Sequence, residues 1–262
     1  MVVVNQELIK AFIKEYPWLS KAYSSLISDI EVGELWDMSN VMVVKRMMYN
    51  DHGPVHAHIV AGAALALYKI LLDKGFTPTL IRDGVVKDLE YTWLVPLYGA
   101  LLHDIGNSIH RSIHEKTGAL LAKPIVERAL KKTVRDSITR IRLRQEILHS
   151  IFCTAYDVEC LTIEAGVVKV GDGLDVAEGR ARIPYRMGQI NIHSVSALSI
   201  RMVEIAEGTK APVKVSIYMN ELAGVFQVDE VLMPKLKTTP LKDLVEISVI
   251  VGEKELKTYY PH

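Results

Sequence analysis

Apolar residues recur at helical spacing along most of the first 190 residues, which predicts a mainly α-helical fold for this part of the chain. Leu8, Ile9 and Phe12 share one face of the first predicted helix, and Pro17 should separate that helix from a second one. Further helices are expected over residues 34–49, 54–74, 93–103, 116–132 and 134–156.

Two segments between these helices have a different pattern. Residues 76–90 predict a loop with a short extended piece at 84–87. Residues 157–171 are rich in β-branched side chains and lead into a helix that carries Asp172.

The pattern changes again after Asn191. A helix is predicted over 193–207, and apolar and polar residues then alternate over 213–218, 224–228 and 244–251. Period-two alternation with turn residues between the stretches predicts a small antiparallel sheet. The expected architecture is a helical bundle over residues 1–190 with a small α+β appendage over residues 191–262. The appendage would serve oligomerisation or cover an active site.

The charge balance excludes a strongly basic or acidic protein. The 262 residues contain 31 basic and 31 acidic side chains, so the formal net charge is zero. A nucleic-acid or membrane-surface partner is therefore not expected, and any affinity for phosphate must arise locally.

The chain shows no sign of export. Its first residues lack the basic and long apolar regions of a signal peptide, and we expect no stretch of about 18 residues to be apolar enough to span a membrane. Cys153 and Cys160 are expected to be packed thiols. The sequence therefore predicts a cytoplasmic protein.

The strongest chemical signal is the pair His103–Asp104, which ends the apolar run of the helix predicted over 93–103. Burying an imidazole and a carboxylate together is costly unless a partner satisfies both, and a divalent metal does so. Adjacent side chains diverge by about 100° in mid-helix, but Gly106 favours a helix end, where the two can converge. The alternative is a capping aspartate beside a core histidine.

Other residues extend this signal. His56 opens an apolar helix upstream, and Asp172 lies downstream, so the order is His, His-Asp, Asp. This order, together with the local sequences of residues 50–56, 102–106 and 172–180, resembles the motifs of the HD superfamily of metal-dependent phosphohydrolases. The resemblance implies a helical bundle in which His56, His103, Asp104 and Asp172 bind metal. Asp175 would then support the ligands from behind them.

Extra histidines resemble a subgroup of that superfamily that binds a second metal. The segment from His114 to Gly118 matches a ligand segment of the subgroup, and His149 is the only histidine between His114 and Asp172. The resemblance implies that His114 and His149 hold the second ion. His110 is expected near the site, outside the ligand set.

We expect two divalent ions, with Mn, Fe, Co, Ni, Zn and Mg as the candidates. His56, His103 and Asp172 would hold one ion, and the two oxygens of Asp104 would bridge it to the other. Asp104 and His103 are the expected catalytic residues, because a metal-activated water would attack phosphorus in line.

Arginine and lysine side chains would orient the phosphate group. In the family a lysine often follows the His-Asp-x-Gly segment, whereas this chain has Asn107 there. Alternatively, each of these lysine and arginine side chains lies on a solvent-exposed face or pairs with a carboxylate. The expected substrate contacts are Lys45, Arg46, Arg111, Arg180 and Arg186.

The leading hypothesis is hydrolysis of a phosphomonoester, phosphodiester or phosphoanhydride in a nucleotide-like compound. A di-iron oxygenase would use the same six ligands. A third hypothesis is a metal-dependent nucleotide-binding regulatory protein that signals through the C-terminal sheet. The expected partners are a small phosphoester or nucleotide and a second copy of the chain, paired through that sheet.

Overall fold

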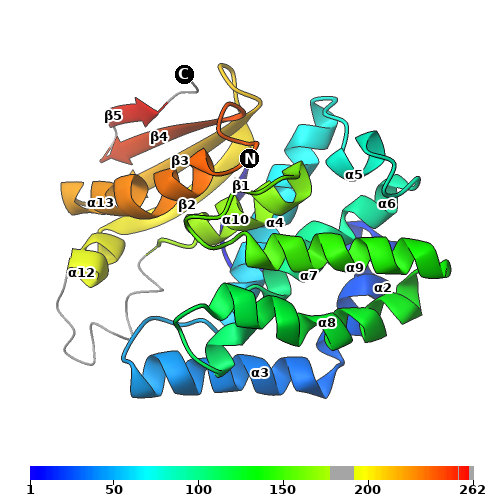
Figure 1. Ribbon diagram of the computed structural model, residues 1–262. Coiled ribbons are helices and arrows are strands. Elements are labelled where there is room, and N and C mark those ends of the chain that lie inside the picture. The colour runs from blue at the N-terminus through cyan, green and yellow to red at the C-terminus, as the bar shows by residue number, and fades with distance from the viewer. Residues whose placement is uncertain (178–191, 253, 260–262) are drawn as a thin grey trace.

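The computed structural model describes residues 1–177, 192–252 and 254–259. It confirms a mainly helical bundle with a small α+β appendage (Figure 1). The helices of the bundle are α1 (Leu8–Glu15), α2 (Pro17–Ile27), α3 (Ile30–Asn40), the π-helix η1 (Val41–Arg46), α4 (Pro54–Asp73), α5 (Thr79–Arg82), α6 (Leu89–Thr92), α7 (Leu94–Leu102), the 3₁₀-helix η2 (Ile105–Ser108), α8 (His114–Thr133), α9 (Ser137–Phe152) and α10 (Ile163–Leu174).

Helix α4 is the central element of the bundle. It begins at Pro54, whose missing N–H costs nothing at a first helical position, and it ends before Gly75, which has φ +85°. It packs against α7 and α10. Gly171 of α10 permits this close approach, because a Cβ there would lie 3.1 Å from the backbone oxygen of Val60 and the backbone nitrogen of Ala64.

The same helix meets the length and composition of a membrane-spanning segment, with a mean hydropathy of 1.6 over an 18-residue window. This corrects the expectation that no stretch would qualify. However, 67% of that window is buried inside the protein. A buried core helix passes the same test, so this observation is weak evidence for a membrane.

The sheet contains both termini of the described chain (Figure 1). Its strands are β1 (Val2–Val3), β2 (Ile200–Glu207), β3 (Val213–Met219), β4 (Val245–Val251) and β5 (Lys254–Tyr259), in the order β1-β2-β3-β4-β5. The pairs β1/β2, β2/β3 and β4/β5 are antiparallel, whereas β3/β4 is parallel. The prediction of an antiparallel sheet was therefore wrong for one pair.

The parallel pairing of β3 and β4 also explains why the strand expected over 224–228 does not form. The expected strand over 224–228 is helical, because a parallel pair needs a long crossover connection, and helices supply it here. Val228, Leu232 and Leu236 are buried at a spacing of four and turn one helical face to the core. The crossover consists of η3 (Leu222–Gly224), α13 (Val225–Gln227), the π-helix η4 (Val228–Leu232) and α14 (Met233–Lys237).

The structure also corrects the helix expected over 193–207. Helix α12 (Ile192–Leu198) ends early, and β2 follows because Val203 and Ile205 alternate with more exposed residues and point to the core. In the segment 76–90, residues 84–87 form a turn between the short helices α5 and α6 and not the expected extended piece. Asp172 lies in the last turn of α10, so much of the β-branched segment before it is helix.

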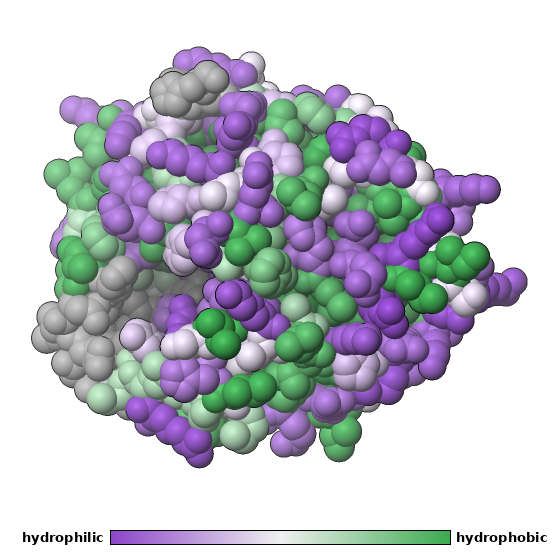
Figure 2. Space-filling view, in the orientation of Figure 1, coloured by the Kyte–Doolittle hydropathy of each residue, from purple (hydrophilic) through white to green (hydrophobic). Residues whose placement is uncertain are grey.

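The bundle and the sheet share one hydrophobic core, in which buried residues of α4, α7 and α10 join those of the strands. The face seen in Figure 2 mixes hydrophilic and hydrophobic residues over the bundle helices. Burial of apolar side chains between the helices therefore gives the candidate site a rigid frame.

The turn after His103–Asp104 depends on Gly106. A Cβ at Gly106 would lie 2.5 Å from the backbone nitrogen of Gly118 and would also strike the carbonyl oxygen of His114. We expect Gly106→Ala to lower the free energy of unfolding by about 3 kcal/mol, because backbone cannot yield as a side chain does. In Gly33→Ala, nothing lies within 4 Å of the new Cβ, and this control should gain about 0.5–1 kcal/mol. Denaturant unfolding measures both, and equal shifts would contradict the predicted close contact.

Candidate metal centre

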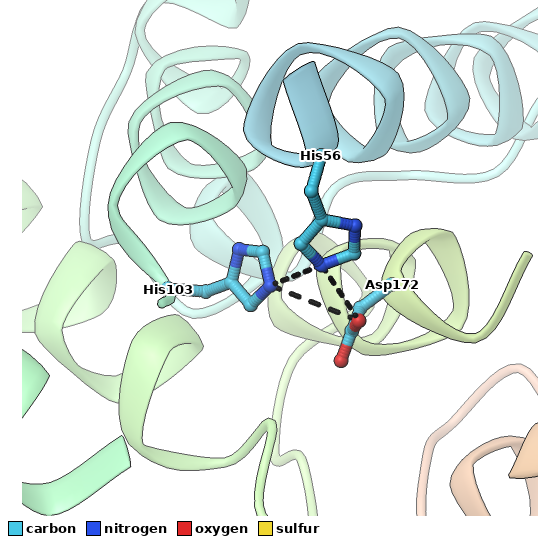
Figure 3. A group of neighbouring side chains, drawn as sticks. All are labelled: His56, His103 and Asp172. Atoms are coloured by element: carbon cyan, nitrogen blue, oxygen red, sulfur yellow. Dashed lines mark hydrogen bonds and ion pairs between the residues drawn. The ribbon is translucent and has the colours of Figure 1, made fainter. Parts of the chain in front are cut away.

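Four side chains from two helices and the turn after a third meet in the interior, and we call them the central cluster: His56, His103, Asp104 and Asp172. His56 lies in the first turn of α4, His103 directly follows α7, and Asp172 lies near the end of α10. Figure 3 shows His56, His103 and Asp172 pointing toward one another, and one ligand atom from each lies within 4.8 Å of the others. The structure thus brings together three of the predicted ligands in a group that could hold a metal ion.

Each imidazole of the central cluster has a fixed orientation. The Nδ1 of His103 donates a hydrogen bond to the carbonyl oxygen of Ala100 at 2.8 Å. The Nδ1 of His56 donates to Oδ2 of Asp175 at 2.6 Å. In neutral imidazoles, both Nε2 atoms then carry lone pairs. Asp175 therefore orients His56 from behind, which is the supporting role predicted from the sequence.

The atoms that meet at the centre are electron-pair donors. The two Nε2 atoms are 3.2 Å apart. Nε2 of His56 lies 3.3 Å from Oδ2 of Asp104 and 3.3 Å from Oδ1 of Asp172. Oδ2 of Asp104 is buried and has no hydrogen-bond partner among the described residues, which is costly for a carboxylate. A divalent cation fits this set, because two imidazole nitrogens and two carboxylate oxygens are ligands that first-row metals prefer.

The carboxylates of the central cluster favour a proton on His103 when no metal is bound. Burial alone would lower the pKa of His103, but the charges of Asp104 and Asp172 raise it to about 9. Burial alone would raise the pKa of both carboxyls. His103 and His52 hold that of Asp104 well below its usual range, and Lys235 does the same for Asp172. A metal ion must therefore displace the proton on His103.

The second oxygen of Asp104 faces a further histidine. Nε2 of His114 lies 3.3 Å from Oδ1 of Asp104, and its Nδ1 lies 2.8 Å from the carbonyl oxygen of Arg111. Asn107 donates to the same Oδ1 at 3.0 Å. Asp104 thus has histidines on both of its oxygens, and its side chain is in a position to join two ligand sets.

His149 lies elsewhere. Its Nε2 accepts a hydrogen bond from the backbone N–H of Leu161 at 3.1 Å, and burial lowers its pKa. In the described part of the chain, the structure does not bring His149 to Asp104. Its place in the sequence suggested a ligand, but the face of α9 on which it lies turns the ring toward the loop before α10.

The structure places beside the cluster a histidine that the sequence analysis did not include. His52 is buried, and its ring centroid is 5.7 Å from that of His56. Its Nδ1 donates to the carbonyl oxygen of Asn50 at 2.7 Å, and its Nε2 accepts from Nη1 of Arg111 at 2.9 Å. The spacing of four between His52 and His56 is the sequence signal that could have found it, although Pro54 begins α4 and leaves His52 outside the helix.

The other predicted polar residues are spread more widely. Arg111 reaches the site through His52 and lies 3.5 Å from Oδ1 of Asn107. Lys45 and Arg46 are exposed on η1, where Arg46 contacts the sulfur of Met42. His110, expected near the site and outside the ligand set, is exposed, and its Nδ1 accepts from the backbone N–H of Ser112. Two further predictions, Arg180 and Arg186, lie outside the described residues.

The structure adds a residue that no sequence pattern indicated. Lys235 of α14 forms a buried ion pair with Oδ2 of Asp172. It lies 63 positions from Asp172 in the sequence, in a segment expected to be an appendage. Only the three-dimensional packing of α14 on α10 brings the two together.

The chain resembles a protein from an archaeon. Over 233 residues it is 43% identical to the uncharacterized protein MJ1020 of Methanocaldococcus jannaschii, and the alignment covers 89% of each chain. The chain belongs to the family of that protein. No protein-family model and no solved structure matches the chain. The relative's name states no activity, so the function of this family has to be argued from the site.

The contrast between Asp175 and His149 gives a test of the site. We expect Asp175→Ala to weaken divalent-metal binding by about 10–100-fold, because His56 would lose the partner that orients it. His149→Ala should leave the affinity and stoichiometry unchanged, because its Nε2 bonds to backbone. Calorimetric metal titration measures both, with circular dichroism to check folding. Loss of a bound ion in His149→Ala would contradict the geometry described here.

Proposed function

We propose that this protein is a metal-dependent phosphohydrolase of the HD type that acts on a nucleotide-like phosphomonoester, phosphodiester or phosphoanhydride. The observation that carries the proposal is the meeting of His56, His103, Asp104 and Asp172 with their lone pairs directed at one buried point. These are the residues on which the sequence resembles the HD superfamily.

A divalent ion held by this cluster would lower the pKa of bound water and neutralise charge on phosphoryl oxygens. The protein's own residues supply the positioning. Asp175 and the carbonyl oxygen of Ala100 fix the two imidazoles, so that no reorientation is needed when substrate arrives. The guanidinium of Arg111, at the edge of the site, is suited to orient an anionic ester.

The number of ions is part of the proposal. Asp104 would bridge two ions through its two oxygens, with His114 on the second one. His149 does not supply the remaining ligand in this geometry. His52 and Arg111 lie on this side of the site instead, so a second ion would have to share the space with a guanidinium group.

Metal analysis of anaerobically purified protein, combined with a turnover screen of nucleotides and phosphoesters, tests the proposal. We expect metal-dependent release of phosphate or nucleotide, and Asp104→Ala should reduce turnover by about a hundredfold or more while the helical fold persists. Asp83→Ala, an exposed carboxylate on the surface, is the matched control and should retain full turnover. A wild-type protein that binds two irons, consumes oxygen and releases no product from any ester would contradict hydrolysis and favour the oxygenase hypothesis.

A further inference from the structure

The C-terminal region reaches into the candidate site through a single buried side chain. The ammonium of Lys235 contacts Oδ2 of Asp172, and the side chains are only 8% and 10% exposed. The ring of Tyr156 covers the ammonium, with its centroid 5.1 Å away. Burying a lysine is costly, so its position needs a compensating interaction.

The surrounding residues are shaped to hold this lysine. A Cβ at Gly173 would lie 3.3 Å from Cδ of Lys235, so the absence of a side chain leaves room for the lysine stem against α10. Cys160 donates its backbone N–H to the carbonyl oxygen of Thr238 at 2.9 Å, which ties the end of α14 to the loop before α10. Lys235 is therefore held at the site from two sides.

Once a divalent ion is bound, the carboxylate of Asp172 no longer requires Lys235 to neutralise its charge. Asp172 presents Oδ1 to the two imidazoles and Oδ2 to Lys235, so a divalent ion and the ammonium would share one carboxylate. A divalent ion and Lys235 together balance the carboxylates of Asp104, Asp172 and Asp175, while Asp51 and Arg111, at the edge of the cluster, offset each other. Without Lys235 the loaded site would be net negative, which disfavours an anion.

A second buried lysine, Lys169, fixes the loop that carries Tyr156. Lys169 lies one turn before Asp172 on α10, and its ammonium donates to the carbonyl oxygens of Ala155 and Val158 at 2.7 Å each. These carbonyls belong to the loop that carries Tyr156. Burial lowers the pKa of Lys169, and the charge of Lys235 lowers it further.

We propose that Lys235 supplies the cation of an anion-binding site beside the metal position, and that this site takes a phosphoryl group. The inference rests on the proposed function and deepens it, because it assigns part of the substrate site to the C-terminal region. The ammonium would leave Oδ2 of Asp172, or share it, and donate hydrogen bonds to phosphoryl oxygens. Lys235 is thus a substrate-binding residue that the order of motifs in the bundle does not reveal.

Two binding measurements on the full chain test this inference. Mn²⁺ binding is measured first, and binding of inorganic phosphate to the Mn²⁺-loaded protein second, both by calorimetry. In Lys235→Met, which keeps the length of the stem, Mn²⁺ should bind as tightly as in the wild type or more tightly, because a repelling charge is lost. Phosphate affinity should fall about tenfold or more. Lys235→Arg should restore part of it, and Lys237→Met, exposed on the same helix, should behave as the wild type.

The outcomes separate this role from a purely structural one. Wild-type phosphate affinity in Lys235→Met would overturn the inference, as would a loaded wild-type protein that binds no phosphate. A parallel loss of Mn²⁺ and phosphate in that variant would also overturn it and leave Lys235 as a structural partner of Asp172. Phosphate binding through Lys235 in a protein that hydrolyses no ester would contradict the proposed function and leave this inference standing.

Discussion

Electron-pair donors that face one another inside a protein repel, and this repulsion is the constraint that the centre of this molecule has to satisfy. The Nε2 atoms of His56 and His103 approach to 3.2 Å while carboxylate oxygens of Asp104 and Asp172 lie beside them. Water cannot screen the charges, because all four residues are buried. A cation has to be present, either as a proton on His103 or as a metal ion.

The hydrophobic core makes this costly arrangement possible. Helices α4, α7 and α10 are buried along most of their length, and each delivers one group of the cluster from its end. At helix ends, backbone carbonyls and side chains are available to fix imidazoles, as Ala100 and Asp175 do here. Apolar burial between the helices thus stabilises polar groups that would be unfavourable on their own.

Much of the bundle and the centre of the site could be predicted from the sequence, because both depend on local signals. Helical periodicity located α4 and α7, and the order of His56, His103–Asp104 and Asp172 identified the cluster. The predictions failed where contacts between residues far apart in the sequence determine the local structure. The residues 224–228 have a strand-like pattern, but they serve a crossover between β3 and the parallel strand β4. Sequence order likewise could not show that His149 bonds to Leu161, or that Lys235 reaches Asp172.

Anomalous diffraction from crystals of the metal-loaded protein tests the central claim most directly. We expect a peak of the bound metal at the point where the cluster converges, with Nε2 of both histidines and one oxygen each of Asp104 and Asp172 about 2.0–2.3 Å away. Loaded crystals that show no anomalous peak there, with the four side chains in the same positions, would contradict the account. The cluster would then be a proton-bridged structural element of the core.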